Sequence, residues 1–306
     1  MRAEVYNPGL GRKEVKAMRR GILVCLAGAI LAGPARANDE ALQKAASLSD
    51  DRMEAFLREA AVVRTKGAGS GITHSVRATL RLGDLEHDAH IQIVDEAKAV
   101  ANLPGGVDTD FRDTYRNNVA AYRLDRRLGL GMIPVSVVRS YEGDTAAFTW
   151  WVDDVAMTED HRRRKNVKVP NVRAWNLETY VVRVFDQLIC NADRNLGNLL
   201  VDKDWRIWMI DHTRAFKVRK QLSNPKVLGN YCDRGLLAGL RKLDRPTLDA
   251  TMEGLLNAEQ IEGLLARRDL IVSYYDAKIT ALGEKVVLYD RPPRGPAVAQ
   301  PLPAAK

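Results

Sequence analysis

Residues 188–216, LICNADRNLGNLLVDKDWRIWMIDHTRAF, constrain the fold more than any other stretch of this 306-residue chain. An apolar helical pattern gives way to a polar loop, and two short apolar segments around an Asp-Lys-Asp turn then predict a β-hairpin. A hairpin returns the chain to its starting point. We therefore expect Asn198, before the hairpin, and Asp211, after it, to face one ion, with Asp193 projecting from the preceding loop.

This arrangement of oxygen-bearing side chains is typical of phosphoryl transfer. In that chemistry one carboxylate accepts or orients the proton of the nucleophile, and an Asn and a second Asp hold magnesium on the phosphates. The spacing from Asp193 to Asn198 is the kinase spacing D-x-x-x-x-N, followed by a hairpin and then Asp211. The alternative is structural, because a turn-rich segment such as Asp-Arg-Asn-x-Gly-Asn often only shapes a loop.

The rest of the chain has a strand-rich part followed by a helical part. The predicted elements are a helix over residues 38–64, a hairpin around Gly83-Asp84, a loop over 103–111, a helix over 115–131, two strands around Glu142-Gly143-Asp144, and helices from Asn176 onward and over residues 231–285. We predict an α+β, bilobal fold with a β-rich N-lobe, residues 38–150, and a helical C-lobe, residues 151–290, with a cleft between them.

Both ends of the chain are expected to lie outside this fold. Residues 18–37 have two arginines, an apolar run of about a dozen residues and an Ala-Arg-Ala ending, which predict a signal peptide too short for a comfortable membrane span. Residues 1–17 then read as an upstream extension, and the protein as exported, periplasmic or secreted; an uncleaved anchor is the alternative. The Pro/Ala-rich residues 291–306 predict a disordered tail.

The net charge of +8 gives little support to nucleic-acid binding. Residues 1–37 contain seven basic and two acidic residues, so the mature chain keeps only about +3. One basic run, residues 161–168, is expected to be a solvated loop, with a site for an acidic substrate as the alternative. His87 and His90 are interpreted as polar surface, and whether Cys190 and Cys232 pair stays open.

The segments DQLICNADRNLGNLL and WMIDHTRAF resemble the catalytic and metal-binding segments of the atypical kinases. These comprise the phosphatidylinositol 3-/4-kinases, the HipA-type kinases and the secretory-pathway, Golgi casein kinase-like enzymes, and the sequence looks closest to a bacterial branch with Ile-Asp-His followed by Arg-Ala-Phe. The resemblance extends over most of the mature chain, from about residue 60 to residue 288. It implies a bilobal kinase fold, ATP or another nucleotide, and Mg²⁺.

The resemblance also implies roles for individual residues. Asp193 would be the catalytic base, Asn198 and Asp211 the magnesium ligands, and Arg194 a group that stabilises the loop or the phosphates. The other implied nucleotide-binding residues are the glycines of the covering turn, Gly67, Gly69 and Gly71, and the hinge residues Trp151 and Val152. An ordinary buried strand with tryptophans is the alternative for the hinge.

Two charged positions of the pattern are neutral here. The strand lysine is Gln92 and the helix glutamate is Asn118, although kinases use that ion pair to hold the α- and β-phosphates. An amide pair preserves the geometry through hydrogen bonds but supplies no charge. Lys66 and Lys98 are the candidate substitutes for the missing cation. The usual His after Asp-Arg is also replaced, by Asn195, which puts the hydrogen bonding of that loop in doubt.

Two functions follow from these observations. The first is a kinase-like phosphotransferase that moves a nucleotide phosphoryl group to a hydroxyl of a protein, a lipid or a small molecule with magnesium. The second is an exported pseudokinase that binds a nucleotide or a partner without turnover, favoured by the neutral pair and by the scarcity of ATP outside the cell. A nucleic-acid partner is the least supported reading.

Overall fold

The computed structural model describes residues 48–67, 75–98, 100–103, 106–108, 110–191 and 194–292. The predicted signal peptide, most of the Pro/Ala tail, and the residues Gly69, Gly71 and Asp193 lie outside these ranges. Within the described ranges, none of the helices combines the length and the apolar character needed to cross a bilayer.

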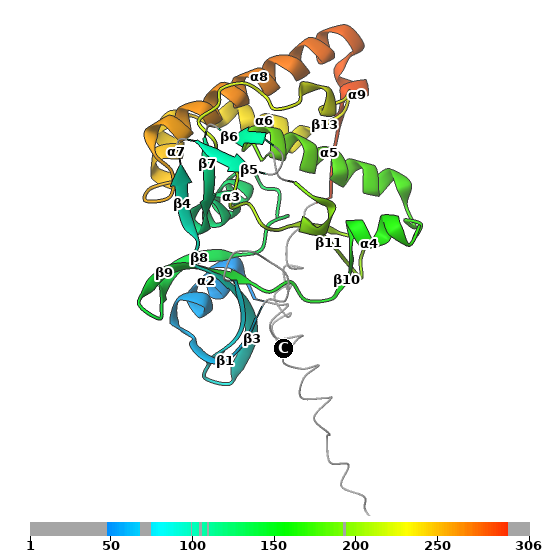
Figure 1. Ribbon diagram of the computed structural model, residues 1–306. Coiled ribbons are helices and arrows are strands. Elements are labelled where there is room, and N and C mark those ends of the chain that lie inside the picture. The colour runs from blue at the N-terminus through cyan, green and yellow to red at the C-terminus, as the bar shows by residue number, and fades with distance from the viewer. Residues whose placement is uncertain are drawn as a thin grey trace, which may run out of the picture.

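The N-terminal part is built on a five-stranded antiparallel sheet with strand order β1-β2-β3-β9-β8 (Figure 1). Its strands are β1 (Ala61–Gly67), β2 (Val76–Leu82), β3 (Leu85–Gln92), β8 (Ser136–Tyr141) and β9 (Asp144–Trp150). Helix α2 (Asp50–Glu59) packs on one face of this sheet, and its Phe56 ring meets the Trp150 ring edge-on at 5.6 Å. The two predicted hairpins, β2–β3 and β8–β9, are therefore confirmed.

The predicted helix over residues 38–64 extends too far. Helix α2 ends at Glu59, and β1 occupies residues 61–67. The physical reason lies in the β-branched residues Val62, Val63 and Thr65, which lose side-chain freedom in a helix and pack well on a pleated strand. The edge strand β1 pairs with β2 along its length.

Strand β3 alternates between two environments. Ala89 and Ile91 are buried in the core, whereas His90 and Gln92 line a cavity on the opposite face. This is the two-residue period of a strand. The sheet therefore presents an apolar face to α2 and a polar face to the rest of the molecule.

A long hairpin separates β3 from the next helix, α3 (Tyr115–Arg127). Its outer strands are β4 (Asp95–Lys98) and β7 (Phe111–Thr114), and its tip strands are β5 (Ala101–Leu103) and β6 (Gly106–Asp108). The predicted loop over residues 103–111 was wrong, because pairing across the tip continues the hairpin.

The C-terminal part is largely helical. A small sheet of β10 (Val155–Thr158), β11 (Leu199–Asp202) and β12 (Ile207–Met209) adjoins it, and β13 (Cys232–Asp233) pairs with β14 (Leu288–Tyr289) in parallel. Its helices are α4 (Glu159–Arg164), α5 (Val172–Leu188), η1 (Leu196–Asn198), η2 (Pro225–Val227), α6 (Arg234–Lys242), α7 (Arg245–Thr251), α8 (Ala258–Leu282) and α9 (Glu284–Val287). Figure 1 shows α8 crossing the end of the molecule opposite the five-stranded sheet.

One further expectation is corrected here, and one open question is answered. The basic run 161–168 is not a plain solvated loop, because its first half belongs to helix α4, where Arg162 and Arg163 both donate to the buried carboxylate of Glu159. Cys190 and Cys232 are buried free thiols rather than a disulfide.

Candidate active site

A cavity of about 370 Å³ lies between the five-stranded sheet and the β11–β12 hairpin. Its lining comes from both parts of the chain. The sequence-predicted site residues in this lining are Gln92, Asn118, Trp151, Val152, Asn198 and Asp211. Segments that are far apart in sequence, such as those of Gln92 and Asp211 at 119 positions, therefore meet at one site.

The hairpin brings Asn198 and Asp211 together as the sequence predicted. Nδ2 of Asn198 donates to Oδ2 of Asp211 at 3.2 Å, and the Thr213 hydroxyl donates to Oδ1 at 3.3 Å. Asp211 has a positive φ of 56°, a backbone conformation that costs free energy in most residues and is tolerated by Asp. That conformation turns the chain out of the hairpin just where the carboxylate is exposed to the cavity.

These two side chains fit a hard divalent cation. Rotating the Asn198 amide presents its oxygen beside the Asp211 carboxylate, and a cation between the two oxygens offsets their repulsion. Across the described ranges, no three His, Cys, Asp or Glu residues form a metal-binding group. The remaining oxygen ligands of such an ion would come from phosphates or from water, as Mg²⁺ prefers.

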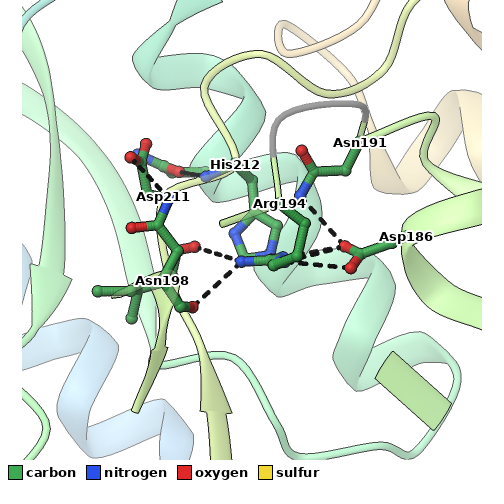
Figure 2. A network of polar contacts seen from close by, with 8 residues as sticks. Asp186, Asn191, Arg194, Asn198, Asp211 and His212 are labelled. Carbon is green, nitrogen blue, oxygen red and sulfur yellow. Dashed lines mark hydrogen bonds and ion pairs between the residues drawn. The ribbon is translucent and has the colours of Figure 1, made fainter. Parts of the chain in front are cut away.

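Arg194 lies at the centre of a buried polar network (Figure 2). Its Nε and Nη2 donate to the Asp186 carboxylate at 3.0–3.2 Å, and its Nη1 donates to the carbonyls of Asn198 and Ile210 at 3.1 and 2.8 Å. Nη2 also lies 2.9 Å from Nε2 of His212. All five N–H groups of the guanidinium are thus engaged by the protein. Of the two roles predicted for Arg194, this arrangement favours stabilisation of the loop.

His212 occupies the other side of the same network. Complete burial lowers its pKa well below the usual value, and the neighbouring Arg194 lowers it further. A neutral imidazole accepts the Arg194 hydrogen bond through Nε2. Asn195, which replaces the usual histidine, caps η1 by accepting from the Asn198 amide at 3.1 Å. Asn195 therefore has a hydrogen-bonding role of its own at the end of this loop.

The neutral pair Gln92 and Asn118 forms a direct contact in the cavity wall. Asn118 Nδ2 donates to Gln92 Oε1 at 2.5 Å, and Asn118 Oδ1 accepts from the His212 backbone N–H at 2.7 Å. Asn117, next to it on α3, donates to the carbonyls of Thr213 and Ala215 at 2.7 and 2.9 Å. Helix α3 is therefore fixed by amide side chains to the segment that follows Asp211.

His90 is a cavity residue that the sequence analysis missed. It lines the cavity two residues before Gln92, so the interpretation of His90 as polar surface was wrong. Burial lowers its pKa, although the nearby Asp211 carboxylate opposes this shift. His87 is also not on the surface, since its ring is 6% exposed and stacks on Trp150 at 3.7 Å. The alternation of β3 was the signal that would have placed His90 beside Gln92.

The two candidate substitute cations lie elsewhere. Lys66 is an exposed residue of the edge strand β1 and Lys98 an exposed residue of β4; the cavity lining includes neither of them. The Lys98 ammonium donates to Glu96 at 2.7 Å. Gly67 ends β1 outside the cavity lining, and the other two glycines of the predicted turn are outside the described residues.

The predicted hinge connects the two sheets. Residues 151–154 join the end of β9 to β10, and Trp151 and Val152 line the cavity. The Trp151 amide donates to the Asp88 carbonyl at 3.1 Å, and the Arg77 guanidinium lies 4.0 Å from the centre of the Trp151 ring. Trp151 is therefore held in place at the cavity wall, outside any regular strand.

Comparison with known proteins shows the fold. Neither a scan against protein-family models nor a search of curated proteins finds a match. Among solved structures, hydra Fam20 with sugar has a TM-score of 0.60 and 12% identity, covering 78% of this chain and 92% of its own. The Golgi casein kinase has a TM-score of 0.56 and 13% identity, covering 79% and 78%, and its form with Mn/ADP bound has a TM-score of 0.54 and 13% identity, covering 79% and 80%.

These likenesses confirm the predicted fold class. The chain has an α+β, bilobal kinase-like fold, with a β-rich N-lobe and a helical C-lobe, as these solved structures have. At 12–13% identity the comparison establishes architecture, and the chemistry has to be argued from the site itself.

Proposed function

We propose that this protein is a phosphotransferase that moves a phosphoryl group from a nucleotide to a hydroxyl group with the help of Mg²⁺. The observation that carries the proposal is the cavity arrangement: Asn198 and Asp211 lie together on the C-lobe side, opposite Gln92 and Asn118 on the N-lobe side. The Mn/ADP bound to a solved kinase of the same fold supports both the nucleotide and the divalent cation.

The cavity provides a place for each part of a nucleotide. The base would lie against Trp151 and Val152, and the phosphates would extend between Gln92 and the Asp211 carboxylate. When bound, Mg²⁺ supplies charge neutralisation and holds the phosphates in register. Asn198 and Asp211 are the residues that would hold the ion.

Asp193 is assigned to catalysis from its sequence spacing. It would accept the proton of the acceptor hydroxyl as that oxygen bonds to the terminal phosphorus, while the bond from phosphorus to the bridging oxygen breaks and the nucleoside diphosphate leaves. The network around Arg194 holds both ends of the loop in place, since it contacts Asp186 before the loop and the Asn198 carbonyl after it. The acceptor is a hydroxyl of a protein, a lipid or a small molecule.

A pseudokinase is the second candidate, and one observation favours it. The two side chains at the positions of the usual ion pair are amides, so the described cavity lining supplies no lysine or arginine to the phosphates. In that case the protein, exported through the predicted signal peptide, would bind a nucleotide or a partner outside the cell without turnover.

Thermal-shift and phosphate-transfer assays on purified residues 38–306 distinguish these two candidate functions. We expect a magnesium-dependent thermal shift with ATP, and transfer of labelled phosphate that Asp193→Ala abolishes while the shift remains. Lack of any nucleotide response would rule out both candidates, and a shift without transfer in the wild type would favour the pseudokinase. Equal labelling of mutant and wild type would contradict the catalytic assignment of Asp193.

A further inference from the structure

Two hydrogen bonds fix which end of the Asn118 side-chain amide is its oxygen and which is its NH₂ group. The His212 backbone N–H can only donate, and it donates to Oδ1 of Asn118 at 2.7 Å. The other end of the Asn118 side chain is therefore its NH₂ group, which donates to Oε1 of Gln92 at 2.5 Å. With its oxygen occupied in this way, Gln92 turns its own NH₂ group away from Asn118.

The NH₂ group of Gln92 is available to a ligand. Gln92 is 4% exposed and lines the cavity, and among the described residues its Nε2 has no hydrogen-bond partner. This Nε2 is not among the described polar atoms that are buried without a partner, so it is accessible from the cavity, where a ligand that brings an acceptor can take the place of water. The described lining contains no lysine or arginine that competes for such an acceptor.

We propose that the Gln92 carboxamide, oriented by Asn118 and the His212 backbone, donates hydrogen bonds to a phosphate oxygen of the nucleotide where other kinases use lysine. This inference rests on the proposed function and assigns its phosphate contact. An amide donates without adding charge, so it holds the phosphate oxygen in position while the neutralisation of phosphate charge falls to the divalent cation. Asn118 acts through Gln92 and is a positioning residue.

The isosteric variant Gln92→Glu tests the contact. Its carboxylate still accepts from Asn118 but presents an oxygen to the phosphate, so we expect the affinity for Mg²⁺–ATP in calorimetry to fall about tenfold or more. The affinity for adenosine, which has no phosphate, should stay unchanged. Gln221→Glu, at an exposed position outside the cavity lining, is the matched control and should bind both ligands like the wild type.

Asn118→Asp tests the orientation. The new carboxylate accepts from both the His212 N–H and Gln92, so Gln92 turns its NH₂ group inward and presents its oxygen to the phosphate. We expect weaker Mg²⁺–ATP binding with unchanged adenosine binding. The uncharged Asn118→Ala should cause no further weakening when it is added to Gln92→Leu.

The outcomes distinguish this inference from the proposed function. If the wild type binds no nucleotide, the proposed function fails and the inference with it. If the wild type binds Mg²⁺–ATP and Gln92→Glu binds it equally well, or loses adenosine affinity to the same extent, the inference alone fails. An added loss of Mg²⁺–ATP affinity from Asn118→Ala in the Gln92→Leu background would show that Asn118 acts directly and would overturn its positioning role.

Discussion

Replacing Arg194 by methionine tests whether the buried network holds the loop between α5 and β11 in place. The side chains of Arg194 and Asp186 are each 10% exposed, and the guanidinium makes three contacts with that carboxylate at 3.0–3.2 Å. Arg194→Met leaves Asp186 with only the Asn191 amide, 3.1 Å away, among the partners in this network. It also removes the donors to the Asn198 and Ile210 carbonyls.

The size of the effect follows from the burial of this pair. Removing one partner of a buried ion pair typically costs about 3–5 kcal/mol, because the other charge is left without compensation. For a domain of this size that corresponds to a fall in melting temperature of roughly 6–20 °C. Urea unfolding followed by tryptophan fluorescence measures the free energy of unfolding directly.

A variant that breaks a solvent-exposed salt bridge serves as the control. Arg241 and Asp276 form an ion pair in which the side chains are 47% and 49% exposed, and Arg241→Ala should cost about 1 kcal/mol or less. If Arg194→Met loses no more stability than Arg241→Ala, the network does not hold the loop, and the structural role of Arg194 is refuted.

Two further variants test whether His90 and Lys98 contribute to Mg²⁺–ATP binding. His90→Ala should weaken Mg²⁺–ATP binding by about two- to tenfold, the usual worth of one uncharged hydrogen bond, and an unchanged calorimetric affinity would remove His90 from the site. Lys98→Ala should leave that affinity unchanged because Lys98 pairs with Glu96 outside the cavity; weaker binding would mean that Lys98 supplies the missing charge after all.

The Asn198–Asp211 pair was predictable because its geometry is local. One short hairpin brings Asn198 and Asp211 together. Alternating apolar residues around an Asp-rich turn predict such a hairpin from the sequence. The Gln92–Asn118 contact was also foreseen, since two amides at the positions of an ion pair can keep its geometry. Both expectations rest on spacing or on paired substitution.

The supporting contacts were not predictable in the same way. The partnership of Asp186 with Arg194 depends on how α5 packs against the loop, and the contacts of Asn117 with the segment after Asp211 depend on how α3 meets the C-lobe. No local pattern encodes these distances. The strand at residues 61–67 is a different case, because its β-branched residues are a recognisable strand signal. The prediction gave more weight to the helical spacing of the apolar residues before it.

The central claim is that Asn198 and Asp211 hold a divalent cation on the phosphates of a nucleotide. A crystal structure determined with Mn²⁺ and a non-hydrolysable ATP analogue tests it most directly. We predict an anomalous peak at about 2.1 Å from oxygens of Asn198 and Asp211, with a phosphate oxygen of the analogue as a further ligand. The Gln92 amide should lie within hydrogen-bond distance of another phosphate oxygen. A cavity that holds the analogue with no metal at Asn198 and Asp211, or a metal bound elsewhere, would contradict the account.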